Sequence, residues 1–463
     1  MHRIPALLLI AAFLLAACSP ATGLITESQP TSTPTPTAPL PTPLVYTPTP
    51  TATQIPDVGS SPDKLKGTEI RVWHGWDGST ASLFDQMASE FSLTNQWGIK
   101  VSVTRYQNLS LLADAMGKAL STPEQPDIVV ALPEQILAWQ TQVLDLTPYT
   151  VQPGIGFDTW DLLANFGDQS SVDGVRYGLP AARTARFVFY NVSFAHDLGF
   201  ASAPHTQDEF RKQACAANAF WKKDKDLTND GYGGLALDVN SNWQTPYSWL
   251  ATNGGKVFSG GEVLFNTPDN IKALEFISNL RADNCAWLPD SDSNYEFLAN
   301  RRALFITGGL SDIGAENVAF STVSSPDQWT VLPFPGQDAG IVMYGPDYAV
   351  LKSNSAHQLA AWLFMRWMMD AKNQVRWTLG TGLFPVTNSA MGSLKTNSSA
   401  TPQWAAALDL LPLAKSYPST AAWSQANKIL ADGFIAYFRS YPSQPLSNVL
   451  EQMDAIMKDL SKK

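Results

Sequence analysis

The stretch Gly178-Leu-Pro-Ala-Ala-Arg-Thr-Ala-Arg-Phe-Val-Phe-Tyr-Asn191 decides how this chain is organised. Pro180 fixes an extended segment, and the aromatic and β-branched run from Phe187 to Tyr190 predicts a strand. Patterns of alternating strand and helix lie on both sides of it. We therefore expect this stretch to leave one α/β lobe and to enter a second.

The region before this stretch predicts a parallel sheet, because strand and helix patterns follow one another in turn. The ligand site of such a sheet lies beyond the carboxyl ends of its strands. The loops from His74 to Gly78 and from Leu132 to Gln135 should therefore face a cleft. The predicted elements are a strand at Glu69-Ile-Arg-Val-Trp73, a helix after Ser79, a strand at 99–103, a helix at 109–120 and a strand at Asp127-Ile-Val-Val-Ala131.

Length and composition indicate a soluble protein of two domains. A chain of 463 residues exceeds what one core usually holds, and 44% hydrophobic with 16% charged residues is typical of globular proteins. The net charge of −10 argues against nucleic acid or anionic lipid as partners, since both require a basic surface. A neutral or weakly polar ligand fits this charge.

The N-terminus predicts export. Residues 1–17 carry Arg3 followed by an apolar run too short for a membrane span, as in a signal peptide. The run ends in Leu15-Ala16-Ala17-Cys18, which resembles a lipoprotein signal in which the Cys18 thiol accepts lipid. Ordinary secretory cleavage beside an incidental cysteine is the alternative. Residues 18–62 are rich in Thr and Pro and predict an extended linker.

Two cysteines remain if Cys18 carries lipid. In an oxidising exterior, Cys215 and Cys285 are expected to form a disulfide, and two buried free thiols are the alternative.

Several ordered segments resemble one family, the extracellular solute-binding proteins of ABC importers, within the cluster that binds sugars. The resemblance implies a periplasmic-binding-protein-like α/β fold with two lobes, three hinge crossings and a ligand cleft between the lobes. The segments are Gly178–Asn191, "PDIVVALPEQ", Trp243-Gln-Thr-Pro-Tyr-Ser-Trp249 with Asn253-Gly-Gly, Arg302–Gly309, Trp329–Gly336, and the long helix from about His357 followed by Thr381-Gly-Leu-Phe-Pro385.

The resemblance also implies lobe boundaries. Lobe 1 is expected at 68–180 plus 337–385, and lobe 2 at 181–336 plus 386–463. The segment Trp329–Gly336 is similar to the family's second crossing between the lobes. A third crossing is expected near Phe384 to Thr387.

The expected ligand contacts combine the cleft loops with positions implied by the family. Aromatic rings suit sugars because the C–H face of a pyranose covers a ring while its hydroxyls stay free for polar groups. Glu134 could instead be a helix N-terminal carboxylate, and core packing competes for Tyr247 and Trp423. Trp76 is favoured for binding, since its loop is flanked by glycines. The set is His74, Trp76, Asp77, Glu134, Arg183, Thr184, Trp243, Tyr247, Gly309, Tyr344 and Trp423.

The ligand class stays partly open. A phosphate would require Arg or Lys, and only Arg183 and Arg186 lie near the predicted cleft, which favours an uncharged sugar. Glycerol phosphate or another polyol ester remains an alternative. Leu310 stands where the resemblance implies a Trp, so this position departs from the family's pattern for a sugar contact.

Enzymes leave motifs that this sequence lacks, and the five histidines form no ligand-spaced cluster. Glu134 and Asp77 could still be the carboxylate pair of a carbohydrate-active enzyme. A structural or signalling lipoprotein is a third hypothesis. Asp226, Thr228, Asp230 and Gly231 echo a calcium loop, but Leu237 replaces its closing acid, so we expect a hydrogen-bonded turn and no metal.

The sequence as a whole predicts a monomeric lipoprotein outside the cell that captures a sugar and delivers it to an ABC permease, without a cofactor.

Overall fold

The computed structural model describes residues 56–164, 166–223, 225–238, 242–289, 295–395 and 401–462. The predicted signal peptide, Cys18 and most of the predicted linker lie outside these residues. Residues from Gln54 onward form one compact unit. Within the described ranges, every helix is too short or too polar to span a membrane.

A mixed sheet forms the centre of the first lobe. β1 runs parallel to β2 and β3, whereas β15 is antiparallel to β3 and to β6. All four residues of β3 are buried, as its uninterrupted apolar sequence predicts. In spatial order the strands are β2 (Lys100–Arg105), β1 (Glu69–His74), β3 (Ile128–Ala131), β15 (Asp347–Val350) and β6 (Leu179–Pro180).

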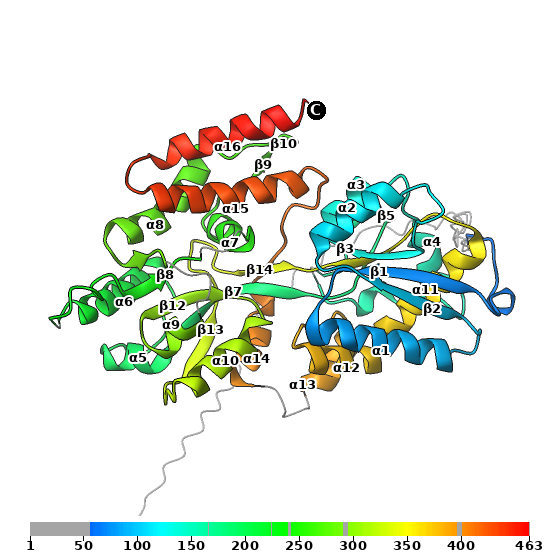
Figure 1. The fold of residues 1–463 in the computed structure, drawn as a ribbon, viewed down its shortest axis with the longest axis horizontal. Coiled ribbons are helices and arrows are strands. Elements are labelled where there is room, and N and C mark those ends of the chain that lie inside the picture. Colours follow the sequence, from blue (N-terminus) through cyan, green and yellow to red (C-terminus); the bar gives the residue numbers. More distant parts are fainter. Residues whose placement is uncertain are drawn as a thin grey trace, which may run out of the picture. The chain divides into compact units, whose positions relative to one another are not determined.

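Helices cover both faces of this sheet, with α1 and α12 on one face and α2 and α3 on the other (Figure 1). Asn108 caps α2 by accepting a hydrogen bond from the Leu111 N–H, and Asn354 caps α11 in the same way. The helices are α1 (Gly78–Thr94), α2 (Leu109–Ala119), α3 (Pro133–Ala138), α4 (Thr147–Thr150), α11 (Ser355–Met369), α12 (Ala371–Thr381) and α13 (Asn388–Lys395).

The second lobe contains a larger sheet built around β7, which pairs antiparallel with β12, β13 and β14. β8 runs parallel to β11 and β12, so the carboxyl ends of these three strands lie at one edge. The strands are β11 (Ala286–Trp287), β8 (Gly233–Ala236), β12 (Ala303–Gly308), β7 (Thr184–Asn191), β14 (Ile341–Tyr344), β16 (Ala414–Lys415) and β13 (Trp329–Leu332).

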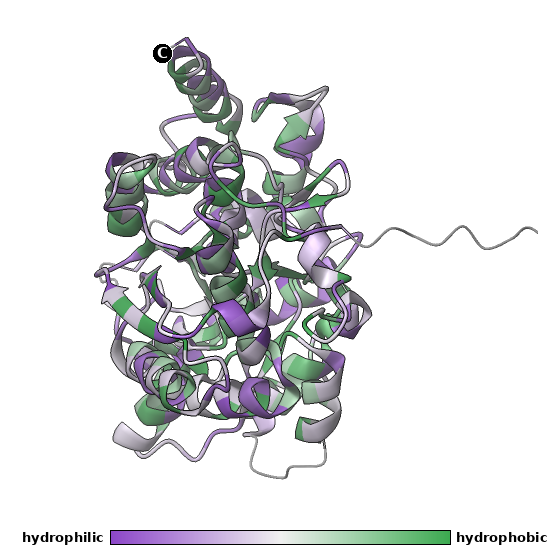
Figure 2. Cartoon of the chain, turned by 90° about the vertical axis from the view of Figure 1, so that its right-hand side faces the viewer, coloured by the Kyte–Doolittle hydropathy of each residue, from purple (hydrophilic) through white to green (hydrophobic). Residues whose placement is uncertain are grey.

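Two helices of the second lobe begin at residues typical of a helix N-terminus. α6 begins with a capping box formed by Thr206 and Glu209, and α8 begins with Pro268 after the cap Thr267. Hydrophobic and hydrophilic residues alternate along the C-terminal helix, as an amphipathic helix requires (Figure 2). The helices are α5 (Val192–Asp197), α6 (Gln207–Trp221), α7 (Gln244–Thr252), α8 (Pro268–Ala282), α9 (Tyr295–Ala299), α10 (Asp312–Thr322), α14 (Pro402–Asp409), α15 (Trp423–Ser440) and α16 (Leu446–Leu460).

The chain changes sheet where the opening stretch predicts it. Pro180 ends β6 in the first sheet, and Thr184 begins β7 in the second. The aromatic run of β7 is buried throughout, because its two faces pack inside the second lobe. The first crossing between the two lobes is therefore an extended segment.

The second crossing lies later than predicted. Trp329–Gly336 does not leave the second lobe, because β13 pairs with β7 and Phe334 pairs with Gly340 on the way to β14. The chain returns to the first sheet only between Tyr344 and Asp347. The boundary at 336/337 was therefore placed too early, since the proline-rich segment is a turn within one sheet.

The third crossing also lies later than predicted. Phe384 pairs with Arg183 and Thr387 with Leu162, both within or beside the first lobe. α13 then packs on α12, whereas α14 packs on β13 of the second lobe. The chain therefore still belongs to the first lobe at α13 and to the second lobe at α14, and residues 396–400 lie outside the described residues.

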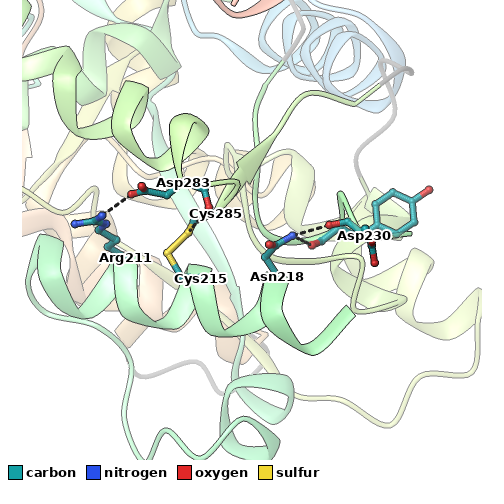
Figure 3. The surroundings of a disulfide bond; sticks show 7 residues. Arg211, Cys215, Asn218, Asp230, Asp283 and Cys285 are labelled. Atoms are coloured by element: carbon teal, nitrogen blue, oxygen red, sulfur yellow. Dashed lines mark hydrogen bonds and ion pairs between the residues drawn. A yellow bond between two sulfur atoms is a disulfide. The ribbon is translucent and has the colours of Figure 1, made fainter. Parts of the chain in front are cut away.

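The predicted disulfide is present. Cys215 on α6 and Cys285 next to β11 are joined, with a sequence separation of 70. Figure 3 shows two further links on the same face of α6, an ion pair between Arg211 and Asp283 and a hydrogen bond from Asn218 to the Asp230 carbonyl. α6 is thus held to the sheet at several points.

Candidate ligand-binding site

Loops that follow parallel strands bring polar groups from both lobes to the candidate site. In the first lobe β1 ends at His74, and β3 leads through Leu132 into α3. In the second lobe β8 is followed by Asp238 and β12 by Gly309. Ligands of parallel sheets bind at such edges. The loops from His74 to Gly78 and from Leu132 to Gln135 therefore follow the carboxyl ends of parallel strands, and their contact with a ligand stays a prediction.

Glu134 links the two lobes. Pro133 begins α3, and the Glu134 side chain is 1% exposed. Its Oε2 accepts a hydrogen bond from the Tyr417 hydroxyl at 3.1 Å, and its Oε1 accepts one from Asn427 Nδ2 at 3.3 Å. Burial raises the pKa of this carboxyl to about 7. A carboxyl of the first lobe is thus held by two groups of the second.

Tyr417 is also one of five aromatic side chains of the second lobe that pack on one another, and we call these five the aromatic cluster. Ring centroids lie 4.8 Å apart for Trp243 and Tyr417, and 5.2 Å apart for both Trp243 and Tyr247 against Trp423. Trp423 is 0% exposed at the start of α15, with no hydrogen-bond partner for its indole nitrogen. The cluster consists of Trp243, Tyr247, Tyr344, Tyr417 and Trp423.

Tyr344 and Thr184 connect the aromatic cluster to the turn after β12. A Cβ atom at Gly309 would lie 2.9 Å from the Tyr344 hydroxyl, so only glycine fits there without a shift. Thr184 Oγ1 accepts a hydrogen bond from the Leu310 N–H at 3.2 Å. Three predicted contacts, Thr184, Gly309 and Tyr344, therefore lie together.

Arg186 lies behind this turn in a buried network of charges. Its guanidinium pairs with Asp238, donates to Thr245 Oγ1 at 2.9 Å and lies 3.7 Å from Asp312. Burial, with Asp312 nearby, raises the pKa of Glu316 to about 9. The positive charge of Arg186 is therefore balanced by carboxylates of the protein.

Arg183 occupies a different place from the one predicted. The guanidinium is 0% exposed and pairs with Asp347. It also donates to the carbonyl oxygens of Gly345 at 3.3 Å, Pro346 at 3.0 Å and Phe166 at 2.8 Å. These groups belong to the second crossing and to the first lobe. Arg183 fastens the two crossings together, and we omit it from the proposed ligand contacts.

The loop after β1 also differs from its prediction in part. The Trp76 indole packs on Phe84 and Trp377, with ring centroids 4.9 Å from each, because the loop turns back over α1 and α12. His74 is buried, and its Nδ1 accepts a hydrogen bond from the Trp76 N–H. Asp77 is exposed at the start of α1. Of these three residues, His74 is buried, Trp76 is half-buried and Asp77 is exposed.

Tyr417 and Asn427 are site residues that the sequence analysis missed. Asn427 follows Trp423 by four residues on α15, so the two side chains share one helix face. That spacing could have identified Asn427. Tyr417 lies in the loop between β16 and α15, where no pattern in the sequence marks it.

The predicted turn after α6 is hydrogen-bonded as expected. Asp226 Oδ1 accepts from the Thr228 N–H at 2.9 Å and from its hydroxyl at 2.6 Å. Among the residues described, no three or more His, Cys, Asp or Glu side chains are grouped as metal ligands.

Glu134 predicts a specific dependence of stability on pH. Its pKa rises from 4.5 to about 7, so the folded protein binds more protons than the unfolded chain between these pH values. Stability contributed at this position therefore falls as pH rises through that window. We expect Glu134→Gln, which is neutral throughout, to gain about 2 kcal/mol relative to wild type between pH 5 and 7.5.

The measurement is chemical unfolding of both proteins at the two pH values. The exposed Glu124→Gln serves as the matched control and should follow wild type. Parallel pH curves for wild type and Glu134→Gln would contradict the expectation.

Comparison with protein families identifies a match over most of the chain. The model of the bacterial extracellular solute-binding proteins matches residues 86–393. Curated relatives in Brucella abortus (strain 2308) and Brucella suis biovar 1 (strain 1330) are named as binding proteins. They are 21% identical over 311 residues, which is 64% of this chain and 71% of each relative.

Solved structures share the fold over most of the chain. The cyclic α-maltosyl-1,6-maltose binding protein of Arthrobacter globiformis has a TM-score of 0.69 at 18% identity, covering 85% of this chain and 99% of its own. The sugar-binding protein MalE of Xanthomonas citri has a TM-score of 0.71 at 19% identity, and the match covers 85% of this chain and 97% of MalE. UgpB of Mycobacterium tuberculosis, solved with glycerophosphocholine, has a TM-score of 0.68 at 17% identity, and the match covers 86% of this chain and 99% of UgpB. These similarities show a common α/β fold.

Proposed function

This chain belongs to the family of bacterial extracellular solute-binding proteins, and on that basis we propose that it captures a carbohydrate between its two lobes and delivers it to an ABC transporter permease. Membership places its role outside the cytoplasm. The observation that carries the carbohydrate proposal is the aromatic cluster beside the interlobe carboxyl of Glu134. Rings stack on the C–H faces of sugars, and a carboxylate accepts bonds from their hydroxyls.

The charges around the aromatic cluster support an uncharged ligand. Arg183 is paired with Asp347, and Arg186 is paired with Asp238. Neither guanidinium is left to neutralise a phosphate, which would require a donor of positive charge. A glycerophosphodiester, the ligand named for UgpB, is the alternative that this arrangement disfavours.

The proposed cycle uses the crossings as hinges. Ligand bound between Glu134 and the aromatic cluster contacts both lobes only when they are closed, so it favours closure by its differential affinity. The permease then recognises the closed lobes. We further propose that Cys18 carries a lipid that anchors a monomer outside the cell membrane.

The first experiment is a thermal shift of the full chain against mono- and oligosaccharides, polyols and glycerophosphodiesters. Stabilisation grows with ligand concentration over Kd, so a saccharide that binds raises the melting temperature and is recovered unchanged. A shift with glycerophosphodiesters alone would establish the alternative ligand. Slow conversion of a saccharide would indicate an enzyme, with Glu134 and Asp77 as its carboxyl pair.

Trp423 gives a sharper test of the aromatic cluster. We expect Trp423→Ala to weaken saccharide binding roughly 10- to 100-fold, equivalent to about 1–3 kcal/mol of lost stacking and desolvation. Trp423→Phe keeps a ring and should lose less. Calorimetry measures the affinities, and circular dichroism checks that each variant is folded.

The matched control is Trp160→Ala, since Trp160 is 90% exposed. Its affinity should equal that of wild type. A folded Trp423→Ala variant with unchanged saccharide affinity would remove the aromatic cluster from the ligand site.

A further inference from the structure

A pocket of about 450 Å³ lies at one edge of the second sheet. Its volume is within the roughly 300–1,000 Å³ of pockets that take a small molecule. Strand β11 forms this edge, at the end of the sheet opposite β14, from which the chain passes to the first lobe. None of the described residues that line the pocket belongs to the aromatic cluster. We call it the edge pocket, and its lining includes Gly231, Tyr232, Arg281, Trp287, Phe297 and Arg302.

Three aromatic side chains line the edge pocket in a row. Ring centroids lie 5.1 Å apart for Tyr232 and Trp287, and 5.0 Å apart for Trp287 and Phe297. The turn before β8 is held by Asn218, which donates to the carbonyl oxygens of Asp230 at 2.9 Å and Tyr232 at 2.8 Å (Figure 3). The rings are therefore fixed in place and offer a surface to a flat apolar group.

Two arginines line the same pocket. Unlike the neighbouring Arg301, neither Arg281 nor Arg302 forms an ion pair with a carboxylate of the described residues. The Arg302 guanidinium lies 5.3 Å from the centroid of the Tyr232 ring. Arg281 Nη1 donates to the Ala286 carbonyl at 3.4 Å, and its Nε is buried without a partner. Because the whole chain carries a net charge of −10, these two charges are a local reversal of sign, which favours an anion.

Trp287 supplies a second, independent observation. Its side chain is 9% exposed, and its indole nitrogen has no hydrogen-bond partner in the described structure. Buried polar groups without partners are uncommon and cost stability, so such a group at a pocket wall is suited to a ligand. An indole N–H only donates, as does a guanidinium. The ligand that fits these groups therefore accepts hydrogen bonds and carries negative charge.

We propose that the edge pocket binds a small aromatic acid, whose carboxylate pairs with Arg281 and Arg302. A guanidinium matches a carboxylate in shape, because it can donate two parallel hydrogen bonds to the two oxygens. The ring of the acid packs on the aromatic row, which an inorganic anion without an apolar face would leave uncovered. The proposal does not depend on the carbohydrate function, since the edge pocket shares no described lining residue with the aromatic cluster.

The experiment measures affinities of the full chain by calorimetry. The probes are benzoate, hydroxybenzoate and indole carboxylate, each beside its neutral amide, and inorganic phosphate. We expect at least one carboxylate to bind at least about tenfold more tightly than its amide, because the amide lacks the charge that the guanidinium groups recognise. The same carboxylate should bind at least about tenfold more tightly than phosphate, because phosphate lacks the ring.

Three variants locate the ligand. Arg281→Met and Arg302→Met should each weaken carboxylate binding roughly 3- to 30-fold. Arg439→Met is their matched control, because Arg439 is exposed on α15, outside the edge pocket. Gly231→Trp should fill the pocket and weaken binding at least about tenfold, since a Cβ atom added at Gly231 meets no atom within 4 Å. Melting temperatures check that each variant is folded.

Failure of all three carboxylates to bind at millimolar concentration would overturn the proposal. Equal affinities for each carboxylate and its amide, or for the carboxylates and phosphate, would also overturn it, because the charge or the ring would then contribute nothing. Binding that keeps its wild-type affinity in the folded Arg281→Met, Arg302→Met and Gly231→Trp variants would show that the acid binds elsewhere on the chain.

Discussion

Arg183→Met is expected to lower the free energy of unfolding by roughly 3–5 kcal/mol, the cost of leaving one partner of a buried ion pair without the other. Asp347 would remain 1% exposed with its charge unpaired by an arginine. Its Oδ2 would keep only the hydrogen bond from Ser170. The Gly345 carbonyl would also lose its guanidinium donor, whereas the Pro346 carbonyl would keep the backbone N–H groups of Ala181 and Ala182. The variant should therefore unfold at much lower denaturant concentration.

The position of Arg183 adds a functional expectation. Its guanidinium joins the crossing before β7 to the crossing before β15, and these are the segments about which we propose that the lobes move. A folded Arg183→Lys variant keeps the charge but has fewer donors in a fixed plane. We expect it to change saccharide affinity although Arg183 itself does not reach the aromatic cluster.

Denaturant unfolding measures the stability lost in Arg183→Met, and Arg211→Met is the matched control. Arg211 pairs with Asp283 on the surface, where an ion pair contributes about 0–1 kcal/mol. Asp347→Asn tests the same pair from its other side, and the double variant gives the coupling between the two. Similar losses in Arg183→Met and Arg211→Met would refute the structural role assigned to Arg183.

Removal of the disulfide is expected to lower the free energy of unfolding by about 4 kcal/mol. The bond closes a loop with a sequence separation of 70, and in the chain-entropy model a loop of that length restricts the unfolded chain by this amount. Cys215→Ala with Cys285→Ala should therefore unfold more readily than wild type. Neither cysteine belongs to the aromatic cluster, so saccharide affinity should be unchanged.

Unfolding with and without reductant gives the measurement and its control together. Reductant should shift wild type toward the double variant and leave the double variant unchanged. If the denaturant unfolding curve of wild type is the same with and without reductant, the disulfide contributes no stability.

Local patterns in the sequence determined the architecture. The crossing strand at Gly178–Asn191, the buried strand at Ile128–Ala131 and the helix at Gln207–Trp221 follow from hydrophobic periodicity and from proline and cap residues, which act within a few positions of the chain. The disulfide followed from the count of cysteines once Cys18 was set aside.

The tertiary structure decided which of these side chains face a ligand. Arg183 meets Asp347 across 164 positions, and Glu134 meets Tyr417 across 283, so neither pairing could be inferred from neighbouring residues. Trp76 and Trp423 were both expected to contact the ligand, yet Trp76 packs on Trp377 in the first lobe, whereas Trp423 packs on Trp243 in the aromatic cluster. Periodicity states that a side chain is buried, but only the packing of distant segments determines what it is buried against.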